Sequence, residues 1–242
     1  MRIALVHARC QLLELLRLPA ASVPMLLFPS LFFAFFGLSA PRELANVTMT
    51  SFAAFAVLGI AFFQFGVGIA AERVSAWERF LRTLPVGPRE RFGARLLTAL
   101  AFALTAASVV VAVAVAATPV SLGSSAWARV SLVVFVGALP FALLGIAIGY
   151  WASPKAALPV ANVLYLALSY AGGLWARPAA LPHPVRSLSV GLPTRAWGEV
   201  LWASAAGRSW PGWALAELAA ATVVFGLAAA VGYRRDEGQR YT

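Results

Sequence analysis

Long apolar runs separated by short polar links dominate this chain of 242 residues. A helix rises ~1.5 Å per residue, so a run of about 20 apolar residues crosses the ~30 Å hydrocarbon core of a bilayer. The pattern therefore predicts an all-α polytopic membrane protein, a single transmembrane domain over residues 1–242. The six predicted transmembrane helices are residues 19–38, 47–70, 96–117, 127–151, 156–174 and 213–233.

Three segments outside these spans have their own patterns. Residues 1–18 mix arginines with leucines, which predicts an interfacial helix on the membrane surface. Residues 175–210 hold four prolines and four tryptophans, so we expect an outer re-entrant segment that dips into the interface and returns. An ordinary interfacial loop is the alternative. The polar tail from residue 234 is expected to fray.

The segment 71–95 is the one densely charged stretch between two spans, with nine ionisable residues. Its large apolar residues recur at the spacing of one helix face, and Pro85 ends the pattern. This predicts a short amphipathic helix along the membrane surface, although a basic loop can also serve only as a topology anchor. The apolar face consists of Trp77, Phe80, Leu81 and Leu84.

The run ERVSAWERFLRTLP, from Glu72 to Pro85, resembles the loop between the second and third spans of ATP-binding-cassette type-2 exporter permeases. Val74, Ala76 and Leu84 depart from the family pattern. In that family the segment is the coupling helix, which docks into a groove of the ATPase subunit. The resemblance implies a coupling role for Glu72, Arg73, Trp77, Arg79, Phe80, Leu81, Arg82, Leu84 and Pro85. Residues 17–37 and 172–194 resemble the first span and the re-entrant outer hairpin of the same permeases.

Composition agrees with a membrane protein, since 61% of the residues are hydrophobic, 12% are charged and the mean hydropathy is +0.82. One cysteine and two histidines exclude an internal disulfide and a His/Cys metal cluster. The spans hold no paired acids and no nucleophile motif, so an intramembrane enzyme is not expected. The net charge of +10 comes from dispersed arginines and suits anionic lipid headgroups, not nucleic acid.

A few polar residues interrupt the predicted spans. Polar groups are expensive inside a membrane, so such residues are candidates for a substrate path. Simpler roles are an interhelical hydrogen bond for Gln64 and contact with water for Glu217, which lies near a span end. The five candidates are Gln64, Asn162, Tyr165, Ser169 and Glu217. A further pair, Gly145 and Gly149, has the small-xxx-small spacing that allows close helix packing.

Basic residues are distributed unequally between the two ends of the predicted spans. If both termini lie on one side, that side holds 13 of the 19 basic residues, including the six arginines of 71–95. Cytoplasmic loops carry the excess of Lys and Arg, so both termini and the charged segment are predicted to be cytoplasmic in a bacterial inner membrane.

The chain lacks the phosphate-binding motif G-x-x-x-x-G-K-[ST], so no directly bound cofactor is expected. The family resemblance implies that ATP and Mg²⁺ bind to a separate nucleotide-binding subunit. It also implies a permease subunit that works beside a second permease copy, a homodimer or close homologue, and exports a hydrophobic or amphipathic substrate. The short form resembles the drug and antibiotic-resistance branch. The alternative is a non-transporting scaffold or the anchor subunit of a sensor complex.

Overall fold

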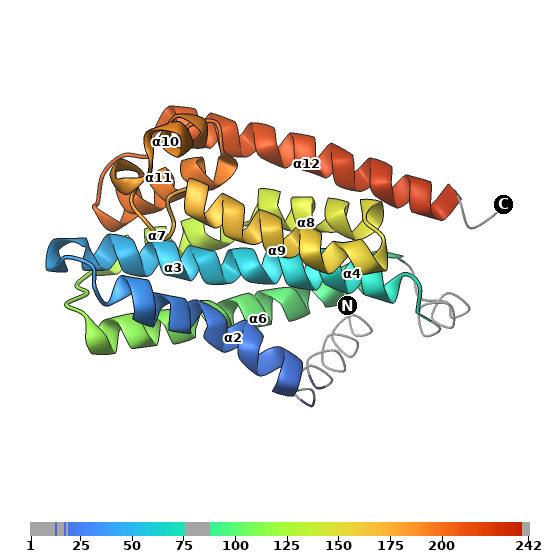
Figure 1. Ribbon diagram of the computed structural model, residues 1–242, viewed down its shortest axis with the longest axis horizontal. Coiled ribbons are helices and arrows are strands. Elements are labelled where there is room, and N and C mark those ends of the chain that lie inside the picture. The colour runs from blue at the N-terminus through green and yellow to red at the C-terminus, as the bar shows by residue number, and fades with distance from the viewer. Residues whose placement is uncertain (1–12, 14–16, 18, 76–87, 239–242) are drawn as a thin grey trace.

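The computed structural model describes residues 13, 17, 19–75 and 88–238 (Figure 1). Every regular element formed by these residues is helical, which confirms the predicted all-α class. Four stretches within them are long and apolar enough to cross a membrane: Arg42–Glu72, Leu96–Ala117, Ser124–Trp151 and Gly212–Asp236. They correspond to four of the six predicted spans. The other two predicted spans, 19–38 and 156–174, are helical over most of their length but do not belong to this set.

The elements follow one another along the chain as a succession of helices joined by short links. They are α2 (Pro19–Phe32), η1 (Phe33–Gly37), η2 (Arg42–Leu44), α3 (Ala45–Ile60), η3 (Ala61–Val67), α4 (Gly68–Glu72), α6 (Pro88–Ala117), α7 (Ser124–Val136), α8 (Leu139–Trp151), α9 (Pro154–Ala171), η4 (Pro178–Ala180), α10 (His183–Ser189), α11 (Pro193–Ala205) and α12 (Gly212–Gly238). Among them η1 and η3 are π-helical turns within longer helices, and η2 and η4 are single 3₁₀ turns.

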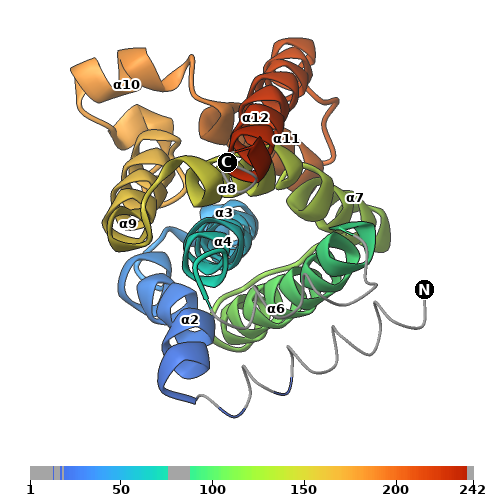
Figure 2. The same cartoon turned by 90° about the vertical axis from the view of Figure 1, so that its right-hand side faces the viewer.

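The continuous helix α3–η3–α4 forms the centre of the bundle. Figure 2 shows it nearly end-on, with α2, α6, α7, α8 and α9 arranged around it. Most of its side chains are buried, including Phe52, Phe55 and Phe62, which have no exposed surface. A helix that is apolar all round is suited to such an enclosed position. The second predicted span is therefore the core of the protein.

Close packing of α8 on η3 and α4 depends on two glycines. A Cβ atom at Gly145 would lie 2.3 Å from the carbonyl oxygen of Ala61, and one at Gly149 would lie 2.7 Å from Cβ of Ile69. Both distances are shorter than atoms tolerate, so only glycine lets the two backbones approach this closely. This confirms the packing role expected from the Gly145–Gly149 spacing.

The predicted span 127–151 differs from expectation because it consists of two helices, α7 and α8, with a turn at Gly137 and Ala138. Pro140 stands in the first turn of α8, where its missing N–H breaks the ladder of helical hydrogen bonds. Gly137 also leaves room for the ring of Trp197, because a Cβ there would lie 2.2 Å from the indole nitrogen.

The predicted outer segment 175–210 contains η4, α10 and α11, and two of its four tryptophans do not lie where we expected. Trp197 is fully buried and Trp202 is 8% exposed, so both face protein and not the membrane interface. Their indole N–H groups donate to the carbonyl of Val133 (2.8 Å) and to Oγ of Ser51 (2.8 Å). Tryptophan content alone does not distinguish a lipid-facing ring from one with a partner inside the bundle. The re-entrant path of this segment stays a prediction.

The end of α12 was also predicted wrongly. The helix continues through Arg234 and Arg235 to Gly238, whereas the sequence pattern suggested fraying from residue 234. The continuation is explained by side-chain contacts of Asp236, which are described below.

Replacing Gly145 with alanine is expected to destabilise the bundle. The added methyl group collides with the Ala61 carbonyl, and overpacking of this kind costs about 1–3 kcal/mol, which exceeds the gain of about 1 kcal/mol in helix propensity. Thermal unfolding of the purified protein in detergent should show a lower midpoint.

Gly226→Ala is the matched control, because this glycine also lies inside a helix but its added Cβ would meet only Cδ1 of Leu143 at an ordinary 3.6 Å. An equal or higher unfolding midpoint for Gly145→Ala than for Gly226→Ala would contradict the packing role.

Candidate functional site

The candidate site lies at the end of the bundle where α4 ends and the predicted coupling segment begins. Figure 1 shows the end of α4, the junction of α8 and α9, and the C-terminal end of α12 at the same end of the molecule. Glu72 and Arg73 are the two predicted coupling residues that the structure describes. The others lie outside the described residues: Trp77, Arg79, Phe80, Leu81, Arg82, Leu84 and Pro85.

Arg73 joins three elements through its guanidinium group. Its backbone closes the last turn of α4, with the amide donating to the carbonyl of Ile69 at 3.0 Å. Nη1 donates to the carbonyl of Tyr150 at 2.9 Å and Nη2 to that of Ala152 at 2.6 Å. The last carbonyls of a helix have no partner in their own helix, and the fork of an arginine can satisfy two of them at once. Arg73 thus caps the C-terminal end of α8.

The same guanidinium forms an ion pair with Asp236 on α12. Nη1 lies 3.1 Å from Oδ1, and the side chains of Arg73 and Asp236 are 17% and 13% exposed. A charge pair this sheltered is retained only when further hydrogen bonds compensate for lost hydration, and the two carbonyl contacts provide them. Asp236 is the chain's single aspartate, and the pair explains why α12 continues past residue 234.

An aromatic layer from α8 and α12 lies beside this pair. The indole N–H of Trp151 donates to the carbonyl of Ala228 at 2.9 Å, and Arg235 lies over the same ring at 4.9 Å from its centroid. Tyr150 and Tyr233 meet edge to face at 5.5 Å. The layer and the ion pair surround a cavity of about 300 Å³, lined by Arg73, Tyr150, Trp151, Ser153, Gly232, Arg235 and Asp236.

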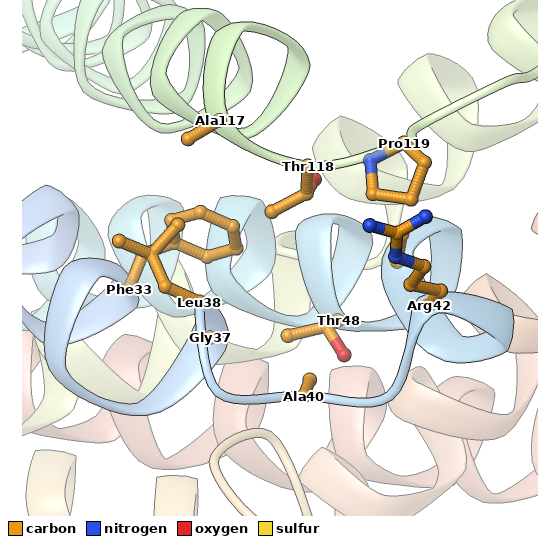
Figure 3. A pocket seen from close by; sticks show the side chains of 10 residues that line it. Phe33, Gly37, Leu38, Ala40, Arg42, Thr48, Ala117, Thr118 and Pro119 are labelled. Atoms are coloured by element: carbon orange, nitrogen blue, oxygen red, sulfur yellow. The ribbon is translucent and has the colours of Figure 1, made fainter.

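A second cavity, of about 240 Å³, lies between η1, the start of α3 and the end of α6 (Figure 3). Arg42 and Thr48 line it from one side, and Thr118 and Pro119 from the other. Close by, the side chain of Asn46 exchanges two hydrogen bonds of 2.9 Å with the backbone of Ser121. These bonds connect the start of α3 to the link after α6, beside the cavity.

Two of the five predicted substrate-path residues come together on α9 and bind backbone. The hydroxyl of Tyr165 donates to the carbonyl of Phe55 at 3.2 Å, and its ring is stacked on Phe55 at 4.5 Å. Ser169 donates to the carbonyl of Tyr165 at 2.5 Å. Both side chains are buried; Tyr165 connects α9 to the central helix, whereas the bond of Ser169 stays within α9.

The remaining path residues are dispersed. Gln64 is half-buried in η3, and Asn162 is exposed on α9. Glu217 is half-buried on α12, a helix that packs against α8 and α11. Its Oε1 atom is buried and accepts no hydrogen bond from the described residues. The five residues therefore do not converge on one cavity within the described part of the chain.

The sequence pattern missed most of the partners of Arg73. Asp236 offered a signal, because a lone aspartate directly after an apolar span is unusual in a chain with few acids. The carbonyls of Tyr150 and Ala152 offered none, because backbone acceptors are not visible in side-chain patterns.

Comparison with known proteins finds a relative that aligns with 68% of the chain. The chain is 27% identical over 165 residues to YvfS of Bacillus subtilis (strain 168), which carries the description of a transport permease. The alignment covers 68% of this chain and 67% of that protein. No protein-family model matches the chain, and no solved structure matches it. The relative is named as a transport permease, and the apolar helices of this chain suit a multi-pass membrane protein.

Replacing Arg73 with alanine is expected to destabilise the protein by about 1–3 kcal/mol, because the carboxylate of Asp236 and two carbonyls lose a partner. Asp236→Ala should have a smaller effect, since Arg73 keeps both carbonyls. Chemical unfolding in detergent, followed as a double-mutant cycle, measures the coupling between the two side chains.

Arg234→Ala serves as the control, since this neighbouring arginine is exposed. Additive effects of the Arg73 and Asp236 substitutions would contradict the ion pair as a stabilising contact.

Proposed function

We propose that this chain is the membrane-spanning permease subunit of an ATP-driven exporter and that the segment beginning at Glu72 docks on a separate nucleotide-binding subunit. The observation that carries this proposal is the position of Arg73. It stands at the junction between the central helix and the coupling-like segment, and it binds α8 and α12. A displacement of the segment would be transmitted to α4, α8 and α12 through the side chain of Arg73.

The mechanism rests on a division of roles within the segment. The apolar stripe of Trp77, Phe80, Leu81 and Leu84 would fill the groove of the ATPase, while Arg79 and Arg82 would orient it. Arg73 would act at the other end, as the firm attachment to the bundle. ATP and Mg²⁺ would bind to the partner, whose closure supplies the motion.

The remaining features of the proposal follow from the family resemblance. Two permease copies, identical or closely homologous, would assemble with the ATPase subunits in a bacterial inner membrane. The substrate would be hydrophobic or amphipathic, as in the drug and antibiotic-resistance branch. Both termini would be cytoplasmic, in agreement with the bias in basic residues.

Trp77→Ala and Arg79→Glu are expected to weaken association with the nucleotide-binding subunit that copurifies with the wild-type chain. Loss of a large interfacial tryptophan should reduce affinity by about 30-fold or more, equivalent to ~2 kcal/mol. Reversal of the arginine charge should slow assembly most strongly at low salt. Binding kinetics and ATP hydrolysis of purified complexes measure both effects.

Trp213→Ala is the control, because this tryptophan is 47% exposed at the start of α12, the opposite end from Arg73. Unchanged association and hydrolysis for the Trp77 and Arg79 variants would overturn the docking proposal. Normal association without any effect of the permease on hydrolysis would favour a scaffold over a transporter.

The proposed orientation predicts that residue 155 is cytoplasmic and residue 124 is external. Both positions are exposed at helix starts, at opposite ends of the α7–α8 pair. Single cysteines at Lys155 and Ser124, introduced into a Cys10→Ser background, should differ in labelling of intact cells by an impermeant maleimide. Labelling of Lys155→Cys from outside, with Ser124→Cys protected, would reverse the topology.

A further inference from the structure

The geometry points to a binding site for the phosphate of an anionic phospholipid in the cavity beside Arg73 and Arg235, a role separate from coupling to an ATPase. The cavity encloses about 300 Å³ at the end of the apolar helix α12. Basic cavities between membrane helices at the cytoplasmic side are suited to anionic headgroups. The assignment to the inner leaflet rests on the proposed orientation, whereas binding itself does not.

The charge of the cavity is positive after its internal ion pair is taken into account. Asp236 is paired with Arg73 at 3.1 Å, so the carboxylate does not compete strongly for a further cation. Arg235 has no carboxylate partner within the described residues. Its guanidinium is held over the ring of Trp151 at 4.9 Å, a contact that leaves its N–H groups available to phosphate oxygens.

Arg235 is held in place where Trp151 of α8 packs against α12. A Cβ at Gly232 would lie 2.7 Å from Nε1 of Trp151, so this glycine lets the ring lie close to α12. The indole N–H bonds the carbonyl of Ala228, which fixes the ring as a platform for the arginine. Trp151 is nevertheless 52% exposed, and Ser153, whose hydroxyl accepts from the backbone N–H of Ala156, lines the same cavity.

An apolar track leads along α12 to this arginine. Val223, Leu227 and Val231 precede Arg235 at intervals of four residues, and the three aliphatic side chains are 61%, 63% and 48% exposed. Residues at this spacing lie on neighbouring positions of one helix surface. An acyl chain along the track would place its phosphate at the guanidinium. Free phosphate would occupy only the cavity and would leave the apolar track uncovered. The track therefore favours a lipid as the ligand.

Native mass spectrometry of the purified permease, released from nanodiscs of phosphatidylcholine and phosphatidylglycerol in equal amounts, tests the site without the ATPase. We expect the wild-type chain to retain phosphatidylglycerol preferentially. Arg235→Gln should reduce that preference by about fivefold, the effect of one basic side chain at a membrane surface. Arg235→Lys, which preserves the charge, should retain most of it.

Arg129→Gln is the matched control, because Arg129 also lies over a tryptophan, Trp210, at 5.5 Å, but on α7. The preference of the Arg129→Gln variant for phosphatidylglycerol should equal that of the wild-type chain. Equal retention of the two lipids by the wild type, or an unchanged preference in Arg235→Gln, would overturn the proposal. Thermal stabilisation of the protein by inorganic phosphate and by phosphatidylglycerol gives a further test. If both ligands raise the unfolding midpoint equally and Arg235→Gln removes both effects, the ligand is free phosphate and the lipid proposal is overturned. Failure of any of these tests leaves the ATPase-docking experiment unaffected.

Discussion

Enclosure of the central helix is the constraint on which the rest of the structure depends. A helix surrounded by protein on all sides has no room for a large side chain at every contact, because protein interiors are packed as densely as organic crystals. The solution here is to alternate aromatic layers with close backbone contacts. Phe55 stacks on Tyr165 at 4.5 Å, while Gly145 lets α8 approach η3 directly. The outer helices take their positions from these contacts.

Arg73 shows how such a packed core can be connected to a segment at the end of the bundle. The central helix is apolar over most of its length, and directly after its end one guanidinium binds two carbonyls at the end of α8 and the carboxylate of Asp236 on α12. Each acceptor alone would be a modest contact, but their combination in one planar fork gives directional attachment. The arginine that the family motif presents as a docking residue is also a structural one.

Hydrophobic periodicity predicted the all-α class and the location of most helices, because both depend on the residues within each helix itself. It did not predict the turn at Gly137, which depends on space for Trp197 from a helix 60 residues later. Nor did it predict the burial of Trp197 and Trp202, since a tryptophan at an interface and one bonded inside a bundle have the same local pattern. Of the candidate site, Arg73 was predicted from a motif, whereas its acceptors on α8 depend on the end of another helix.

The π-helical turn η3 determines the direction in which Arg73 points. It lies between α3 and α4, and each residue of a helix turns the following chain by about 100°. A wide turn of this kind holds an extra residue compared with a regular helix, and it shifts the angular phase of everything after it. Loss of one residue from Ala61–Val67 would leave the span as apolar as before, yet it would rotate Arg73 away from the carbonyls of α8. The length of the second span is thus constrained by the direction in which Arg73 must point, as well as by the thickness of the membrane.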